Sequence, residues 1–159
     1  MTSNEISLRK ASPSDVEAIT SLINSAFRIA EEFFVDEERI TTQGVVEHME
    51  TGEFLLAERN GKLDGCVYLE HRGERTYLGL LSVDPTIQKG GLGSRIVSEA
   101  EGYCKNRGAR FMDISVVNLR EELLPFYGKR GYVEIGISPF QEEVELKRPC
   151  HFIRMAKQP

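Results

Sequence analysis

The chain has little cysteine, little histidine and no apolar run long enough to cross a membrane. Its three cysteines, Cys66, Cys104 and Cys150, are widely separated and show no CxxC or histidine-paired spacing. This argues against a zinc site and favours reduced, structural thiols. The first residues also lack the basic start and apolar core of a signal peptide. We therefore expect a cytoplasmic protein with no metal and no membrane attachment.

Basic residues are also in the minority. Lysine and arginine number 20 against 25 acidic residues, which gives a net charge of −5 and an isoelectric point near 5.3. A broad nucleic-acid-binding face is therefore not expected, although a local basic pocket is compatible with this balance. The 159 residues, 40% of them hydrophobic, fit one domain spanning residues 1–159.

Glycine, by contrast, is concentrated in one motif. A branched apolar run ends at Asp84, and Gly90, Gly91 and Gly93 then precede a helical repeat, a pattern that predicts strand, loop and helix. Glycines let a ligand approach the backbone, and the first N–H groups of a helix carry partial positive charge, so this segment suits a phosphate. On the glycines alone, a turn that merely caps the helix is an equal alternative.

Two well-known phosphate loops do not fit this segment. No Walker sequence occurs, and the GxGxxG that begins at Gly91 has Ile96 at its third glycine position. The segment from Gln88 to Gly93 instead has the pattern Q/R-x-x-G-x-G/A and resembles the acyl-CoA pyrophosphate loop of the GNAT superfamily of N-acetyltransferases. Residues 123–127, followed by Gly131 and Tyr132, are similar to the second motif of that superfamily.

The resemblance implies an α/β fold with a single mixed central sheet of about seven strands flanked by helices. It also implies acetyl-CoA as co-substrate and direct attack by a primary amine of a small molecule or protein. The positions that match cofactor contacts are Leu81, Ser82, Val83, Gln88, Lys89, Gly90, Gly91, Leu92, Gly93 and Ser94. Asn118 is a weaker candidate, because the family's Asn, seven residues before the motif Tyr, is Arg120 here.

Tyr127 is the candidate general acid, because its motif position would let the phenol hydrogen-bond the departing sulfur. A core aromatic residue is the alternative interpretation. The base is left open. The family's glutamate position is occupied by Tyr77, and Glu70, His71, Glu74 and a water chain are the other candidates, together with the acidic segment described next.

Five carboxylates lie in residues 28–42, and two of them, Glu31 and Glu32, stand next to Phe33 and Phe34. In the superfamily this segment lines the acceptor pocket, so the resemblance implies that Glu31 and Glu32 hold an amine. A short solvated helix followed by a loop is the alternative.

Periodicity predicts the remaining elements. The expected strands are 6–9, 54–59, 63–69, 75–83, 111–117, 132–137 and 152–156, and the expected helices are 14–27, one ending at 45–49, one from 92 to about 106, and 121–129. Residues 138–149 form a polar excursion through which a homodimer could form. Two other functions stay open: a noncatalytic acyl-CoA-binding regulatory module and a general nucleotide-phosphate binder.

Overall fold

The computed structural model describes residues 7–34, 38–87, 90–140 and 148–159, which build one seven-stranded mixed sheet in the order β1-β2-β3-β4-β5-β7-β6. Its strands are β1 (Leu8–Lys10), β2 (Glu53–Arg59), β3 (Lys62–Arg72), β4 (Arg75–Val83), β5 (Phe111–Val117), β6 (Val133–Pro139) and β7 (His151–Lys157). Its α-helices are α1 (Val16–Glu31), α2 (Thr42–Thr51), α3 (Leu92–Asn106) and α4 (Leu123–Gly128). The expected seven-stranded mixed sheet is confirmed.

The first half of the sheet is antiparallel and is built by local turn chemistry. Asn60 and Gly61, with φ of 53° and 78°, join β2 to β3, and Arg59 pairs with Lys62 across them. Asn-Gly favours this two-residue hairpin because both central residues need positive φ. The predicted hairpin is confirmed.

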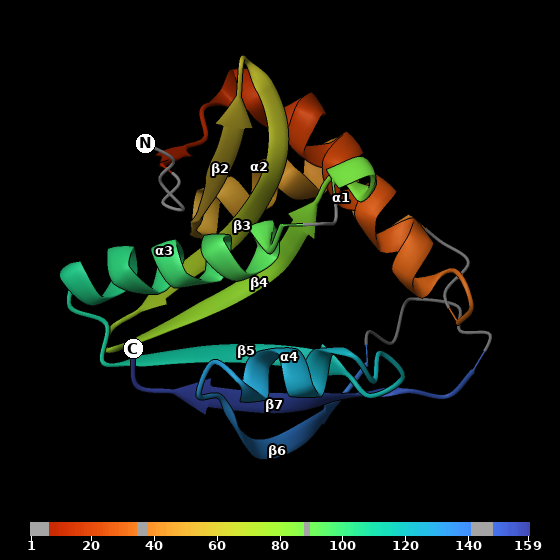
Figure 1. The fold of residues 1–159 in the computed structure, drawn as a ribbon, viewed down its shortest axis with the longest axis vertical. Coiled ribbons are helices and arrows are strands. Elements are labelled where there is room, and N and C mark those ends of the chain that lie inside the picture. The colour runs from red at the N-terminus through yellow and green to blue at the C-terminus, as the bar shows by residue number, and fades with distance from the viewer. Residues whose placement is uncertain (1–6, 35–37, 88–89, 141–147) are drawn as a thin grey trace.

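Strand β4 then leads through α3 to β5, and the two strands are parallel, as the strand–helix–strand pattern predicts. They pair at only three positions, from Arg75 opposite Phe111 to Tyr77 opposite Asp113. Beyond these positions β4 stays paired with β3 up to Val83 and β5 stays paired with β7 up to Val117, so the sheet opens between β4 and β5. Figure 1 shows β4 and β5 meeting at one end and spreading apart toward the other.

A β-bulge accompanies this departure. Cys66 pairs with Ser82 and Tyr68 pairs with Gly79, so Leu80 and Leu81 on β4 together face a single residue of β3. Leu80 has a φ of 52°, which is unusual for a residue with a side chain, and the Ser82 hydroxyl donates to the Leu80 carbonyl at 3.0 Å. Such a bulge bends its strand and increases the local twist, which turns β4 away from β5.

Helices cover both faces of the sheet. Helices α3 and α4 lie on one face, and α1 and α2 lie on the other (Figure 1). The two neighbouring leucines of the bulge divide between these layers, since Leu81 packs with the α3 cluster and Leu80 packs with the α1 cluster.

Several element ends differ from the expected ranges. Helix α1 continues to Glu31, four residues beyond the predicted end at Phe27, because the following Arg, Ile, Ala and Glu are compatible with a helix. Thr41 caps α2 by accepting from the Gly44 N–H at 3.0 Å. Helix α4 is two residues shorter at its start than expected.

Candidate functional site

A cavity of about 280 Å³ occupies the opening between β4 and β5. Residues from both faces of the sheet line it: Gly93 of α3 together with Phe126 and Tyr127 of α4 on one side, and Ala26, Phe27, Ile29, Ala30 and Glu31 of α1 on the other. The strands contribute Leu78, Leu80, Leu81 and Val83 of β4 and Ile114, Ser115 and Val117 of β5. The cavity therefore joins the two helical layers, and two reactants could enter it from opposite faces.

The N-terminus of α3 lies at the first side of this cavity. Gly90 and Gly91 have φ of 102° and 70°, a left-handed conformation that glycine adopts without strain. A Cβ built on Gly91 would meet no atom within 4 Å, and one on Gly90 would lie 3.9 Å from Nη2 of Arg95. The Nε of Arg95 is buried and has no hydrogen-bond partner among the described residues. Open backbone, helix N–H groups and a guanidinium thus meet where an anion could bind.

Gln88 and Lys89 of the predicted loop lie outside the described residues. Ser94 is inside the first turn of α3, and its hydroxyl accepts a hydrogen bond from Nε of Arg130 at 3.1 Å. The Arg130 guanidinium carbon also lies 3.8 Å from the centre of the Phe126 ring. Arg130 therefore fastens α4 to the start of α3 and adds a second positive charge there. Arg130 could not be predicted from the sequence, because no local pattern connects it to Ser94.

Tyr127 lines the cavity from α4 and is 7% exposed. Its ring makes edge contacts with Phe126 at 4.9 Å and with Tyr132 at 5.5 Å between centres. Its hydroxyl forms no hydrogen bond to any residue that the structure describes. Burial raises the pKa of the Tyr127 phenol well above its usual value, so the side chain stays protonated at neutral pH. A protonated phenol with no hydrogen-bond partner among the described residues thus lines the cavity.

Glu31 lines the opposite end of the cavity and is only 6% exposed. Its Oε2 lies 3.4 Å from Nη1 of Arg120, and burial raises its pKa while the charges of Arg120 and Arg39 act in the other direction. Glu32 caps the end of α1, is exposed, and is not among the residues that line the cavity. The two carboxylates predicted as a pair are therefore in different surroundings.

The cofactor-binding candidates on β4 also differ in their surroundings. Leu81 and Val83 line the cavity, while the Ser82 side chain is 1% exposed and donates to the backbone of the bulge. Asn118 lies outside the cavity lining, and its Oδ1 accepts a hydrogen bond from the His151 N–H at 2.8 Å. Leu92 packs against the α3-side core.

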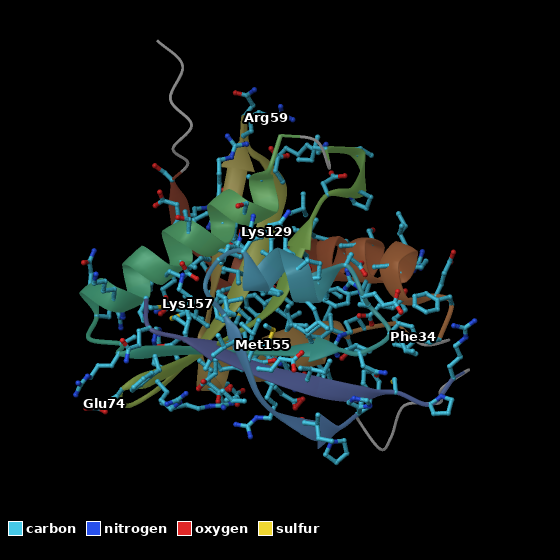
Figure 2. The ribbon with its side chains drawn as sticks, turned by 60° about the horizontal axis from the view of Figure 1, so that its bottom comes forward. Phe34, Arg59, Glu74, Lys129, Met155 and Lys157 are labelled. Atoms are coloured by element: carbon cyan, nitrogen blue, oxygen red, sulfur yellow. The ribbon has the colours of Figure 1, made fainter. Side chains whose placement is uncertain are left out.

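Of the alternative bases, only Glu31 faces the cavity. Glu70 accepts hydrogen bonds from Tyr68 and Arg72, and His71 contacts Glu53 at 2.7 Å. Glu74 ends the turn that leads into β4, and Figure 2 shows it at the opposite end of the sheet from Phe34. The Phe34 ring lies 6.4 Å from that of Phe140, which lines the cavity, so Glu74 is remote from the cavity.

Tyr77, which stands where the family has a glutamate, does line the cavity. Burial raises its pKa, so it is not a base at neutral pH. Among the described residues, no three His, Cys, Asp or Glu side chains gather as a metal ion would require. The described helices include none that is long and apolar enough to span a membrane.

The mixed sheet has one parallel pair that splays apart, a helix start compatible with an anion, and a cavity that joins its two faces. These features are typical of the acyl-group transferase fold that the resemblance in sequence implies. The sequence profile described as "Acetyltransferase (GNAT) family" matches residues 17–132. The chain therefore belongs to the GNAT family of acetyltransferases. No curated protein gives a match in sequence.

Solved structures share this fold. A putative phosphinothricin N-acetyltransferase superposes with a TM-score of 0.79 at 21% identity, over 97% of this chain and 98% of the other. The PaiA N-acetyltransferase of Thermoplasma acidophilum in complex with coenzyme A gives 0.77 at 18% identity, over 98% and 99%. The ribosomal-protein-alanine N-acetyltransferase of Brucella melitensis gives 0.76 at 18% identity, over 97% and 100%. Proteins with this fold thus differ in their named acceptors, so the acceptor of this chain has to be argued from its own cavity.

Proposed function

We propose that the protein is an acetyl-CoA-dependent N-acetyltransferase in which an amine attacks the acetyl thioester directly and Tyr127 acts as general acid. The observation that carries this proposal is the cavity through the sheet, which has an anion-compatible helix start and a protonated phenol on one face and a carboxylate on the other. Family membership and the coenzyme A complex of the Thermoplasma relative support it.

In this proposal the cofactor enters from the α3 side. Its diphosphate binds the N–H groups that follow Gly90 and Gly91, with Arg95 and Arg130 adding charge and the Ser94 hydroxyl nearby. Its pantetheine arm lies in the opening where β4 has left β5, against the backbone of Leu81 and Val83. Backbone groups that have no neighbouring strand can pair with the amides of the arm, as in strand addition.

The acceptor enters from the α1 side, where Glu31 faces its ammonium group. A lysine-like amine with a pKa of about 10.4 is neutral in only about one molecule in a thousand at pH 7, so one proton must leave before attack. Glu31 or water takes this proton. The nitrogen then bonds to the thioester carbon, the carbon–sulfur bond breaks, and the nitrogen loses its second proton.

Tyr127 completes the proton balance. The departing thiolate, with a pKa of about 8.5 as a free thiol, accepts a hydrogen bond and then a proton from the phenol. The second proton lost by the amine restores the phenol. The products are an amide, a free thiol and one proton released to solvent.

Release of free thiol from acetyl-CoA in the presence of a panel of amines tests the proposal. Amine-dependent release is the expected result. If acetyl-CoA stabilises the protein but no amine gives release, the protein is a noncatalytic acyl-CoA-binding module. If ATP or NAD raises the melting temperature and acetyl-CoA does not, a nucleotide-phosphate binder is the better interpretation, and the proposal is wrong.

A further inference from the structure

The acceptor side of the cavity contains more positive charge than an amine site requires. Two guanidinium groups, of Arg39 and Arg120, line it together with the single carboxylate of Glu31. An ammonium ion alone would be repelled by two such cations at close range. The described residues of the lining provide no second carboxylate to balance this excess positive charge.

Arg120 has its own partners. Its Nη1 lies 3.4 Å from Glu31, and its Nη2 lies 3.2 Å from Glu122, which is largely exposed. Its side chain is 15% exposed, so it is held between these carboxylates at the edge of the cavity. We take Arg120 to position Glu31 and to oppose the rise that burial causes in the pKa of that carboxyl group.

Arg39 differs from Arg120 in this respect. It follows α1 and stands just before the Thr41 cap of α2, and none of the described residues forms an ion pair with it. Its guanidinium carbon lies 5.3 Å from the centre of the Phe27 ring, and Arg120 lies 5.8 Å from the same ring. Its charge also acts on Glu31 and on Tyr77, so it lies close to both. Arg39 is therefore a planar donor that lines the acceptor space and has no ion-pair partner among the residues the structure describes.

We infer that the acceptor is an amino acid or a close analogue, whose carboxylate binds Arg39 while its ammonium group faces Glu31. This inference rests on the proposed function and names the substrate class of the same cavity. Arg and carboxylate pair through two parallel N–H···O bonds, which fixes orientation as well as charge. With the carboxylate held by Arg39, the neighbouring amine is directed along the cavity toward the thioester. Arg39 is then a specificity-determining residue.

The rest of the lining indicates which amino acids to try first. Helix α1 contributes Ala26, Phe27, Ile29 and Ala30 to the acceptor side, and all four are apolar. Amino acids with apolar side chains, such as L-leucine, L-methionine and L-phenylalanine, therefore match it best.

The test compares each of these amino acids with its carboxamide and with the amine left when the carboxylate is removed. Wild type is expected to favour the free acid by about 10-fold or more in kcat/KM for thiol release, the range expected for one charge-assisted interaction. Arg39→Gln is expected to abolish this preference, mainly through a higher KM, and Arg39→Lys to restore part of it. Arg28→Gln is the matched control, because Arg28 pairs with Glu38 at 2.9 Å on the surface and does not line the cavity. Its preference should equal that of wild type.

Calorimetry on the protein saturated with coenzyme A gives a second readout that does not depend on turnover. L-Leucine should bind about 10-fold more tightly than L-leucinamide in wild type, and equally in Arg39→Gln. Equal binding of the two compounds by wild type would overturn the inference. So would thiol release with simple amines or peptides that show no preference for a carboxylate, a result that leaves the proposed function intact. If acetyl-CoA binds and no acceptor gives thiol release, the proposed function fails. Calorimetry alone then decides whether the cavity binds the carboxylate of an amino acid.

Discussion

Tyr127→Phe removes one hydroxyl from the cavity and nothing else. The ring contacts of Tyr127 with Phe126 and Tyr132 are retained, because phenylalanine has the same ring. If the phenol is the general acid, kcat for thiol release should fall by about 10² to 10⁴, the usual contribution of a positioned acid. The binding of acetyl-CoA should change little, since the hydroxyl acts only when the thiolate forms.

Stability should not follow activity in this variant. The Tyr127 hydroxyl makes no hydrogen bond to a described residue, so its removal leaves no broken bond among them. We expect a change in the free energy of unfolding below about 0.5 kcal/mol, because the usual loss of about 1 kcal/mol per hydrogen bond does not apply. Chemical denaturation measures this directly.

Tyr132→Phe is the matched control. Its hydroxyl donates to Glu101 at 2.8 Å, outside the cavity, so this variant loses a partly buried hydrogen bond and keeps the proposed acid. It should be destabilised by about 1 to 3 kcal/mol with kcat near wild type. A Tyr127→Phe enzyme that turns over within a factor of two of wild type would refute the role of Tyr127. A Tyr132→Phe enzyme with an equal loss of kcat would show that the effect belongs to packing.

Two further perturbations test the phosphate loop and the buried thiols. Gly91→Ala should destabilise the protein by about 1 to 2 kcal/mol and weaken acetyl-CoA binding, because alanine strains a left-handed backbone even where its Cβ has room. Gly102→Ala inside α3 is the control and should stabilise the protein by about 0.5 to 1 kcal/mol. Denaturation and calorimetry measure both, and equal effects would contradict the reasoning. Burial raises the pKa of Cys66 from 9.0 to about 12 and that of Cys104 to about 11, so above pH 9 the unfolded chain loses thiol protons that the folded chain keeps. Stability should therefore fall from about pH 9 by up to about 1.4 kcal/mol per pH unit for each thiol. Cys66→Ala should flatten this decline, and an unchanged slope would contradict the assignment.

Local signals were enough to predict the elements that lead to the cofactor side. The Asn60–Gly61 hairpin, the parallel crossover and the glycine loop each depend on residues close in sequence, and the structure confirms the hairpin and the crossover. Tyr127 came from a motif position, and the structure places it in the cavity. In these parts the chemistry of a few consecutive residues determines the backbone, so a single sequence contains the information.

The acceptor side could not be predicted in the same way. Arg39 and Arg120 meet over Phe27 only because α1 continues past Phe27 and because the chain after β5 crosses the end of α1. These contacts join residues up to 93 positions apart, and no periodicity marks them. The acidic composition of residues 28–42 predicted a site that binds a cation. The two arginines whose charges act on Glu31 are Arg39, near the end of this segment, and Arg120, far from it in sequence.

The bulge shows why the central geometry is also hidden from sequence patterns. The positive φ falls on Leu80 and not on the neighbouring Gly79. A Cβ on Gly79 would lie 2.6 Å from Cε2 of Tyr77, so the glycine is needed to make room for that ring beside the cavity. The left-handed conformation of Leu80 costs about 1 to 2 kcal/mol, and the Ser82 hydroxyl bonded to the Leu80 carbonyl helps to hold it. Because the strained residue lies where β4 bulges and turns from β5, the contacts that hold Leu80 in this conformation also hold open the space in which the proposed transfer takes place.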